Sequence, residues 1–178
     1  MKIAIISGIF FPFPGGAQVQ THNLANKLVE RKNKVDCYIY SKTNIKNNKY
    51  NINIINYFIT SLVFVAQYYI NINLNFIIDC YIKNIIKKKN YNIWYFNFIN
   101  YKSLILINSL KRNNQKVIVT FQGIDIQKNK KIRYGYRFNS KYDKFLKKTL
   151  KNIDIFFAIS KNIKKDLISL KVKKSKIF

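Results

Sequence analysis

The fold is indicated by the first forty residues, MKIAIISGIFFPFPGGAQVQTHNLANKLVERKNKVDCYIY (residues 1–40). The apolar run Lys2–Ser7 predicts a buried strand, and a loop with prolines and glycines follows it over Gly8–Gly16. Apolar residues at helical spacing predict a helix over Ala17–Lys32, and Val35–Tyr40 predicts a second strand. A strand, a helix and a second strand in this order form the unit from which parallel sheets are built.

The alternation of strand and helix patterns continues through the rest of the chain. Runs of β-branched and aromatic residues predict further strands at Asn51–Tyr57, Tyr91–Asn97, Lys116–Thr120 and Asp154–Ile159. Helical patterns occur at Thr60–Ile70, Leu74–Lys88, Lys102–Asn113, Lys141–Asn152 and Lys161–Leu170, and loops are expected at Lys42–Tyr50 and Gln122–Ser140. Neither a repeat nor a linker divides residues 1–178, so we expect one α/β domain with a doubly wound, Rossmann-like parallel sheet.

The stretch from Phe58 to Lys89 allows two interpretations. No charged residue lies between Tyr50 and Ile78, and the apolar residues of Ile59–Ala66 resemble a membrane segment. Polar residues, which are costly in lipid, interrupt the run at Gln67, Asn71, Asn73 and Asn75. Two packed helices are therefore favoured over one helix that spans a membrane.

The chain is strongly basic. Its 33 Lys and Arg residues against 7 Asp and Glu give a net charge of +26, which suggests an anionic partner such as nucleic acid or an acidic membrane surface. A genome rich in A and T would give the same excess of Lys, Asn, Ile and Tyr without selection for a partner, so both explanations stay open. The hydrophobic content of 48% is enough for a core and excludes a disordered tail.

Two features of the sequence indicate the cellular compartment in which the protein is expected. Cys37 and Cys80 lack the spacing of a disulfide framework or a zinc site, so we expect two buried thiols in a reducing compartment. The apolar run after Met1 is too short for a signal peptide, and no small-residue cleavage site follows it. We therefore expect a cytoplasmic location.

A glycine pair, Gly15-Gly16, lies between the first strand and the first helix. Ligands of open α/β sheets bind at this edge, and the free amides at a helix start suit a phosphate or a sugar hydroxyl. The spacing is not that of a dinucleotide-binding loop, and an ordinary tight turn is an equal explanation.

Four segments near the N-terminus occur in a characteristic order: Met1–Ser7, Phe11-Pro12, Gly15–Gln18 and His22–Ala25. This order resembles the opening of family 4-type glycosyltransferases, in which a strand and a proline-containing loop precede Gly-Gly-Ala-Glu and a helix bearing Asn-Leu-Ala. Gln18 stands where glutamate is common in that family. The resemblance implies the N-terminal half of a GT-B fold, with the glycine loop facing the cleft where donor and acceptor meet.

Three later segments extend the resemblance over nearly the whole chain. Tyr91–Asn97 resembles a family strand that carries two histidines, both replaced here. Thr120–Asp125 resembles Thr-x-His-Gly-x-Asp, with Gln122 at the histidine position. Asn152–Ser160 resembles the strand and turn Ala-Asp-x-Val-x-Ala-Val-Ser.

The replaced histidines change the chemistry that the chain can perform. Tyr95, Asn97 and Gln122 stand in their places, and an amide forms hydrogen bonds but does not titrate usefully. His22, on the first helix, is expected to pack or to face solvent rather than to act as a base. Asp125 is the best remaining carboxylate at the ligand edge, where capping of the next turn is an equal alternative. The sequence therefore assigns no catalytic residue.

The resemblance also implies a set of site residues. The expected substrate-binding residues are Gly15, Gly16, Gln18, Asn97, Gln122, Gly123, Asp125 and Ser160. Ser160 is also expected to cap the last helix.

No metal and no cofactor are expected. A nucleotide sugar is the implied co-substrate, and the implied chemistry is retaining. In the family a second Rossmann-like domain binds the nucleotide, and no part of residues 1–178 resembles it, so we expect no sugar transfer by this chain alone.

The implied partners are a sugar acceptor, namely a lipid-linked or cell-envelope glycan, and a second chain that supplies the nucleotide domain. The basic face and the segment Thr60–Ile78 are expected to rest on the inner, anionic face of a membrane. Two alternatives stay open: a basic, non-enzymatic module that binds nucleic acid or anionic membranes, and a degenerate, truncated remnant. Nucleic acid is disfavoured because the aromatic residues fall mainly on strand and core-like positions and no single-strand-binding motif occurs.

Overall fold

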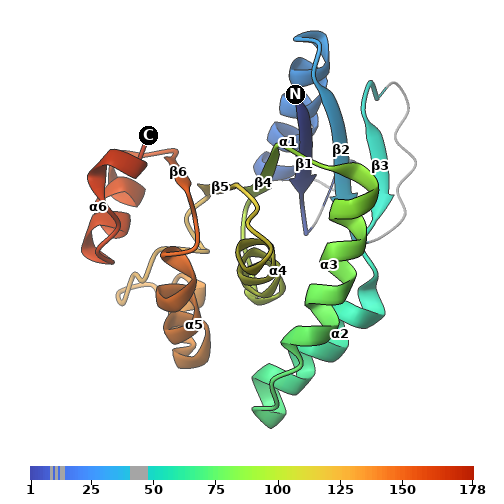
Figure 1. Ribbon diagram of the computed structural model, residues 1–178. Helices are drawn as coiled ribbons and strands as arrows, with labels where there is room; N and C mark the ends of the chain where they lie inside the picture. The colour runs from blue at the N-terminus through green and yellow to red at the C-terminus, as the bar shows by residue number, and fades with distance from the viewer. Residues whose placement is uncertain (9, 11, 13–14, 41–47) are drawn as a thin grey trace.

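The computed structural model describes residues 1–8, 10, 12, 15–40 and 48–178. The strands of this part of the chain are β1 (Lys2–Ile6), β2 (Lys34–Ile39), β3 (Asn51–Ile54), β4 (Ile93–Asn97), β5 (Val117–Phe121) and β6 (Ile155–Ala158). They pair in parallel, in the order β3-β2-β1-β4-β5-β6 (Figure 1). The order reverses at β1, so the doubly wound sheet predicted from the sequence is confirmed.

The helices occupy the connections that the sequence predicted, apart from shifts of a few residues at their ends. They are α1 (Gly16–Glu30), α2 (Tyr57–Val65), α3 (Asn75–Lys89), α4 (Tyr101–Arg112), α5 (Ser140–Leu150) and α6 (Lys161–Ser169). A π-helical turn (Ala66–Ile70) extends α2, and short 3-10 turns lie at Tyr136–Phe138 and Lys174–Lys176. Most of the predicted loop Lys42–Tyr50 lies outside the described residues.

The two faces of the sheet carry different helices. In β1, Ile3 and Ile5 pack with Ala25 of α1 on one face, while Ala4 and Ile6 belong to a larger cluster on the other. The helices after β3 all contribute buried residues to that larger cluster. Strand β1 is therefore covered on both faces, as its continuous apolar sequence predicted.

The segment between β3 and β4 forms a helical hairpin. The side chain of Asn56 caps α2, because its Oδ1 accepts a hydrogen bond from the backbone N of Ile59 at 3.1 Å. The strand predicted to reach Tyr57 therefore ends at Ile54. The two packed helices are confirmed, and no helix among the described residues is long and apolar enough to cross a membrane.

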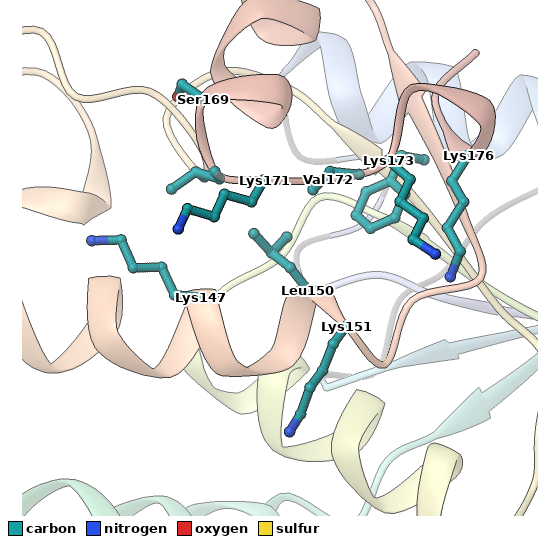
Figure 2. Close-up of a pocket in the computed structure, with 10 residues that line it drawn as sticks. Lys147, Leu150, Lys151, Ser169, Lys171, Val172, Lys173 and Lys176 are labelled. Carbon is teal, nitrogen blue, oxygen red and sulfur yellow. The ribbon is translucent and has the colours of Figure 1, made fainter.

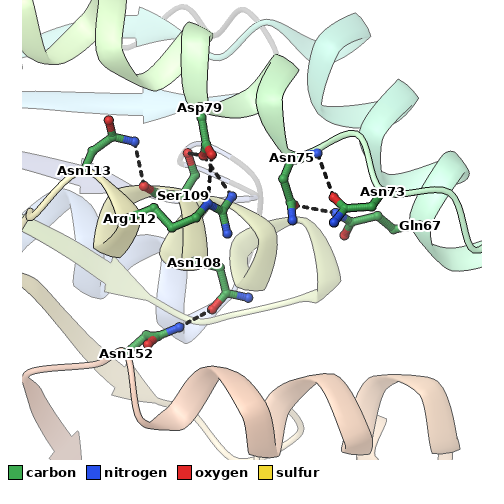
Figure 3. Close-up of polar contacts among 9 residues, drawn as sticks. All are labelled: Gln67, Asn73, Asn75, Asp79, Asn108, Ser109, Arg112, Asn113 and Asn152. Atoms are coloured by element: carbon green, nitrogen blue, oxygen red, sulfur yellow. Dashed lines mark hydrogen bonds and ion pairs between the residues drawn. The ribbon is translucent and has the colours of Figure 1, made fainter.

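Polar contacts tie this hairpin to the body of the domain (Figure 3). Within the hairpin, Nε2 of Gln67 donates to Oδ1 of Asn75 at 2.7 Å. Asp79 of α3 accepts hydrogen bonds from the hydroxyl of Ser109 at 2.5 Å and from two nitrogens of Arg112 at 2.8 Å, both on α4. Because Ser109 is buried, these contacts fix α3 against α4.

The prediction of two buried thiols is half wrong. Cys37, in β2, is buried, but Cys80 is exposed. In α3 the residues Ile78 and Ile82 face the core, and a residue midway between them in sequence lies on the opposite side of a helix. The prediction for Cys80 rested on the usual burial of free cysteine and did not include this helical phase.

Candidate functional site

The carboxyl ends of β1, β4 and β5 meet at one edge of the sheet, beside the first turns of α1. Asn97, the last residue of β4, is only 1% exposed. Its Nδ2 donates to the hydroxyl of Thr21 at 2.7 Å and to the backbone oxygen of Ala17 at 3.0 Å. These bonds fix the end of β4 to helix α1.

Gln122 extends the contact into the loop after β5. Its Nε2 donates to Oδ1 of Asn97 at 2.6 Å and to Oε1 of Gln20 at 2.9 Å. On β4, the hydroxyl of Tyr95 lies 2.7 Å from the hydroxyl of Thr120 and 3.4 Å from Oδ1 of Asn97. We call these side chains the carboxyl-edge network: Gln20, Thr21, Tyr95, Asn97, Thr120 and Gln122.

Sequence reasoning found part of this network. It placed Asn97 and Gln122 at one edge, and the structure brings them into direct contact. It missed Gln20 and Thr21, although both lie three to four residues after Ala17 and hence one turn beyond the glycine pair. That spacing was the available signal, but it could not show which face of α1 turns toward β4.

The glycine turn lies at the start of α1. A Cβ atom on Gly16 would meet no atom within 4 Å, so the backbone there faces open space. The side chain of Gln18 folds back over Gly15, where an added Cβ would lie 2.1 Å from its Oε1. A shallow depression of about 730 Å³ covers this turn and reaches Gln20. The turn is open to a ligand, while the binding roles of Gly15, Gly16 and Gln18 stay predictions.

Asp125 supports the loop after β5 from inside the protein. It is fully buried, and its carboxylate accepts hydrogen bonds from the backbone N–H groups of Gln122 and Gly123 at 3.0 Å. Gly123 has a φ of +126°, which residues with side chains rarely adopt. Burial raises the pKa of the Asp125 carboxyl to about 6, against the backbone hydrogen bonds that lower it. Of the two predicted alternatives, these contacts favour the turn-capping role.

Two other predicted residues lie apart from the network. Ser160 follows β6 at the far end of the sheet, and its hydroxyl accepts from the backbone N of Ile163 at 3.3 Å, which confirms the predicted N-cap. Nδ1 of His22 lies 2.7 Å from the hydroxyl of Tyr50, so His22 packs as expected. Among the described residues, no three His, Cys, Asp or Glu side chains form a group that could hold a metal.

An aromatic pocket of about 450 Å³ lies between the helical hairpin and the loop after β5. Its walls are Phe64, Tyr68, Tyr69, Asn100, Tyr101, Gly135, Tyr136, Asn139 and Tyr142. The ring of Phe98, the residue after Asn97, contacts Tyr136 with 5.9 Å between ring centres. The pocket therefore adjoins the network, and aromatic walls with a few polar groups are typical of small-molecule sites.

A second, basic cavity of about 700 Å³ lies between α5 and the segment after α6 (Figure 2). Leu150, Phe156 and Val172 give it an apolar floor. The lysines around it are Lys147, Lys151, Lys171, Lys173 and Lys176. This cavity lies beside the C-terminal ends of α5 and α6, hence at the amino edge of the sheet and away from the carboxyl-edge network.

Comparison with models of known protein families identifies the family of this chain. Residues 14–178 match the model of Glycosyltransferase Family 4. The chain belongs to glycosyltransferase family 4. This match confirms the resemblance drawn from the glycine turn and the later segments. No curated protein matches the chain.

Solved structures of longer proteins, among them UDP-GlcNAc 2-epimerases and a sucrose-phosphate synthase, share the fold of this chain. UDP-GlcNAc 2-epimerase from Methanocaldococcus jannaschii, in complex with UDP-GlcNAc and UDP, has a TM-score of 0.63 and 16% identity over 100% of this chain and 46% of that one. Sucrose-phosphate synthase from Thermosynechococcus elongatus has a TM-score of 0.63 and 12% identity over 99% and 47%. The Neisseria meningitidis epimerase bound to UDP-GlcNAc has a TM-score of 0.59 and 12% identity over 100% and 46%. The described chain has the GT-B N-terminal fold and spans less than half of each of these proteins.

Proposed function

We propose that this domain is the acceptor-binding half of a glycosyltransferase that moves a sugar from a nucleotide sugar to a lipid-linked or cell-envelope glycan. The observation that carries the proposal is the carboxyl-edge network, which lies beside an open glycine turn and an aromatic pocket. Family membership supports the reaction class. The fold neighbours in complex with UDP-GlcNAc support a sugar-related ligand.

The network suits a ligand rich in hydroxyl groups. A sugar hydroxyl both donates and accepts hydrogen bonds, and so does the amide of Gln122. Asn97 is held rigidly by Thr21 and Ala17, while Gln122 and Gln20 are more exposed and can exchange their mutual bond for bonds to a ligand. Since amides do not take up protons at neutral pH, we assign this network an orienting role and no role as catalytic base.

The aromatic pocket suits the ring of the acceptor sugar. The apolar faces of sugar rings pack on aromatic side chains, and the pocket adds the polar groups of Asn100 and Asn139 at its wall. The pocket wall Tyr136 contacts Phe98, the residue after Asn97, with 5.9 Å between ring centres. We therefore propose that the acceptor binds in the pocket with its reactive hydroxyl toward the network.

We propose that the domain does not transfer sugar without a nucleotide-binding partner domain, in the same or in a second chain. A departing nucleoside diphosphate carries negative charge that must be stabilised in the transition state. In the carboxyl-edge network the polar groups are amides and hydroxyls. Incubation of the purified domain with UDP-glucose or UDP-GlcNAc and a methyl glycoside should give no product by mass spectrometry; a transfer product would contradict this part of the proposal.

Acceptor binding is tested by saturation-transfer NMR with water-soluble methyl glycosides of glucose, mannose and N-acetylglucosamine. Tyr136→Ala, which removes a wall of the pocket, should weaken glycoside binding, measured by saturation transfer, by about two- to tenfold, since one aromatic contact contributes about 0.5–1.5 kcal/mol. Tyr134→Ala is the matched control, because Tyr134 is equally exposed at 38% but does not line the pocket. Equal losses in both variants, or no signal from the unaltered domain, would contradict acceptor binding in the pocket.

The lysine-lined cavity favours a second candidate function, the binding of an anionic ligand by a non-enzymatic module. Lys151, Lys171 and Lys173 line it from α5 and from the segment after α6. Fluorescence anisotropy with a labelled single-stranded oligonucleotide distinguishes the candidates. Sub-micromolar affinity at physiological salt would favour the basic module, whereas weak binding that disappears as salt is raised is what diffuse charge alone predicts.

A further inference from the structure

Helix α2 exposes apolar side chains on the face that turns away from the core. Its outward residues Phe58, Leu62 and Val65 are 74%, 41% and 42% exposed. Tyr69, in the π-helical turn that extends α2, continues the helical spacing and is 66% exposed. Val63, on the opposite face, is buried. The helix is thus apolar on both its inner and its outer face, unlike the surface helix of an ordinary globular domain.

The turn between α2 and α3 continues this surface. Ile70, Ile72 and Phe76 are each more than half exposed. In Figure 1 the hairpin extends beyond the sheet on the side where the strands end. We call the outward apolar residues the hairpin surface: Phe58, Leu62, Val65, Tyr69, Ile70, Ile72 and Phe76. Exposed large apolar side chains gathered on one hairpin indicate an interaction site in a folded protein.

Several polar groups of the hairpin turn are paired within the hairpin. Gln67 donates to Asn75, whose backbone N donates to Oδ1 of Asn73 at 3.0 Å (Figure 3). The backbone N of Ile72 donates to the oxygen of Ala66 at 2.9 Å. No charged residue lies between Tyr50 and Ile78. The surface can therefore leave water without burying a charge.

Cationic side chains flank the hairpin surface. Nζ of Lys102 lies 4.0 Å from the ring centre of Tyr57, and Nζ of Lys141 donates to the backbone oxygen of Tyr68 at 2.6 Å. A hollow of about 380 Å³ places Lys148 and Lys151 close to the turn. Asp79, the nearest carboxylate in sequence, is already paired with Arg112. The charge around the surface is thus positive and complements an anionic partner.

We propose that the α2–α3 hairpin docks the domain on an anionic lipid bilayer, with the hairpin surface in the interfacial layer and the flanking lysines against the headgroups. Aromatic residues such as Phe58 and Tyr69 suit that layer. A second copy of the chain is disfavoured as the occupant, because two molecules of net charge +26 repel each other. This docking role rests on the proposed function. Tyr68 and Tyr69 also line the aromatic pocket, in which we propose that the acceptor binds.

Flotation of the full chain with vesicles tests the docking surface without any acceptor or turnover. Vesicles of equal parts phosphatidylglycerol and phosphatidylcholine should bind the chain, and pure phosphatidylcholine vesicles should bind it at least tenfold more weakly. The double variant Phe58→Gln/Leu62→Gln should bind the anionic vesicles at least tenfold more weakly than the unaltered chain does. Ile132→Gln is the matched control, since Ile132 is 70% exposed but belongs to the loop after β5, and it should bind within twofold of the unaltered chain.

A fluorescence measurement separates insertion from diffuse charge attraction. Trp94, the single tryptophan, is 1% exposed and therefore insensitive to vesicles, so Phe76→Trp introduces a reporter on the hairpin surface. Its emission should shift to the blue on addition of anionic vesicles. The proposal would be overturned if the double variant bound vesicles as well as the unaltered chain and Phe76→Trp showed no blue shift. An absence of vesicle binding together with a dimer that the double variant dissociates would also overturn it, because the occupant would then be a second copy. Failure of acceptor binding leaves these readouts unaffected.

Discussion

At the residue scale, amide side chains form the hydrogen bonds between strand ends at the edge of the sheet where the family resemblance expects histidines. Asn97 and Gln122 make a hydrogen bond of 2.6 Å that joins β4 to the loop after β5. The sequence located these two positions, because the flanking motifs place them at the ends of neighbouring parallel strands. It could not predict their partner Gln20, because the rotation of α1 about its own axis is set by core packing.

Asn97→Ala should lower the free energy of unfolding by about 1–3 kcal/mol, because it removes the buried hydrogen bonds of Asn97 to Thr21 and Ala17 and its bond to Gln122. Urea denaturation measures this change. Asn23→Ala, on the exposed side of α1, is the control and should change the free energy by less than about 0.5 kcal/mol. Equal effects of the two substitutions would mean that the network does not hold α1 to β4.

Asp125 should make stability depend on pH. Burial raises its folded pKa to about 6 from an ordinary value of 3.8, so the folded chain holds a proton that the unfolded chain releases between about pH 4 and 6. This stabilising contribution is complete below pH 4 and is lost as pH rises through 6. Urea unfolding should be measured at pH 4, 5, 6 and 7. Over that range the free energy of unfolding of the unaltered chain should fall by up to about 3 kcal/mol relative to that of Asp125→Asn. Parallel curves for the two proteins would show that folding leaves the pKa of Asp125 unchanged.

At the element scale, the hairpin between β3 and β4 shows what periodicity can and cannot predict. The interruptions at Asn71 and Asn73 correctly divided the uncharged stretch into two helices. The start of α2 was placed three residues late, because Asn56 was not recognised as a cap. The exposure of Cys80 was also missed, since residue type alone does not give the face on which a residue lies.

Asp79→Ala should destabilise the packing of α3 on α4. The substitution removes the acceptor of the buried Ser109 hydroxyl and of two Arg112 nitrogens, and we expect a loss of about 1–2 kcal/mol because the arginine is partly exposed. Thermal unfolding followed by circular dichroism measures the loss. Glu30→Ala, which breaks exposed ion pairs with Lys27 and Lys49, should leave the midpoint unchanged. A shift of the midpoint as large as that of Asp79→Ala would show that the charge balance of the chain, and not the contacts of Asp79 with Ser109 and Arg112, sets the stability.

At the scale of the whole molecule, the arrangement of the sheet puts glycine turn, network and pocket on one edge. The alternation of elements predicted a parallel sheet, and the resemblance predicted its ligand edge, but strand order depends on contacts between distant segments such as β1 and β4. The unbalanced charge of +26 is also a property of the whole chain. It acts over the full surface and opposes the compact state through self-repulsion.

Raising the salt concentration should therefore raise the thermal midpoint of unfolding. The Debye length falls from about 30 Å at 0.01 M to about 8 Å at 0.15 M, which screens repulsion among the 33 basic residues. Calorimetry in sodium chloride and in potassium chloride should give the same rise, because screening does not depend on the identity of the cation. An unchanged or lower midpoint would show that local ion pairs outweigh the net repulsion.

The most direct test of the central claim is chemical-shift mapping of the isotope-labelled domain with methyl glycosides. We expect weak binding in the millimolar range, corresponding to about −4 kcal/mol, because a monosaccharide fills only part of the pocket. The amides that shift should be those of Asn97, Asn100, Gln122, Gly123 and Tyr136, while Lys34, Lys116 and Lys171 at the opposite edge should stay in place. Shifts confined to the lysine-lined cavity, or none at saturating glycoside, would contradict an acceptor site at the carboxyl edge.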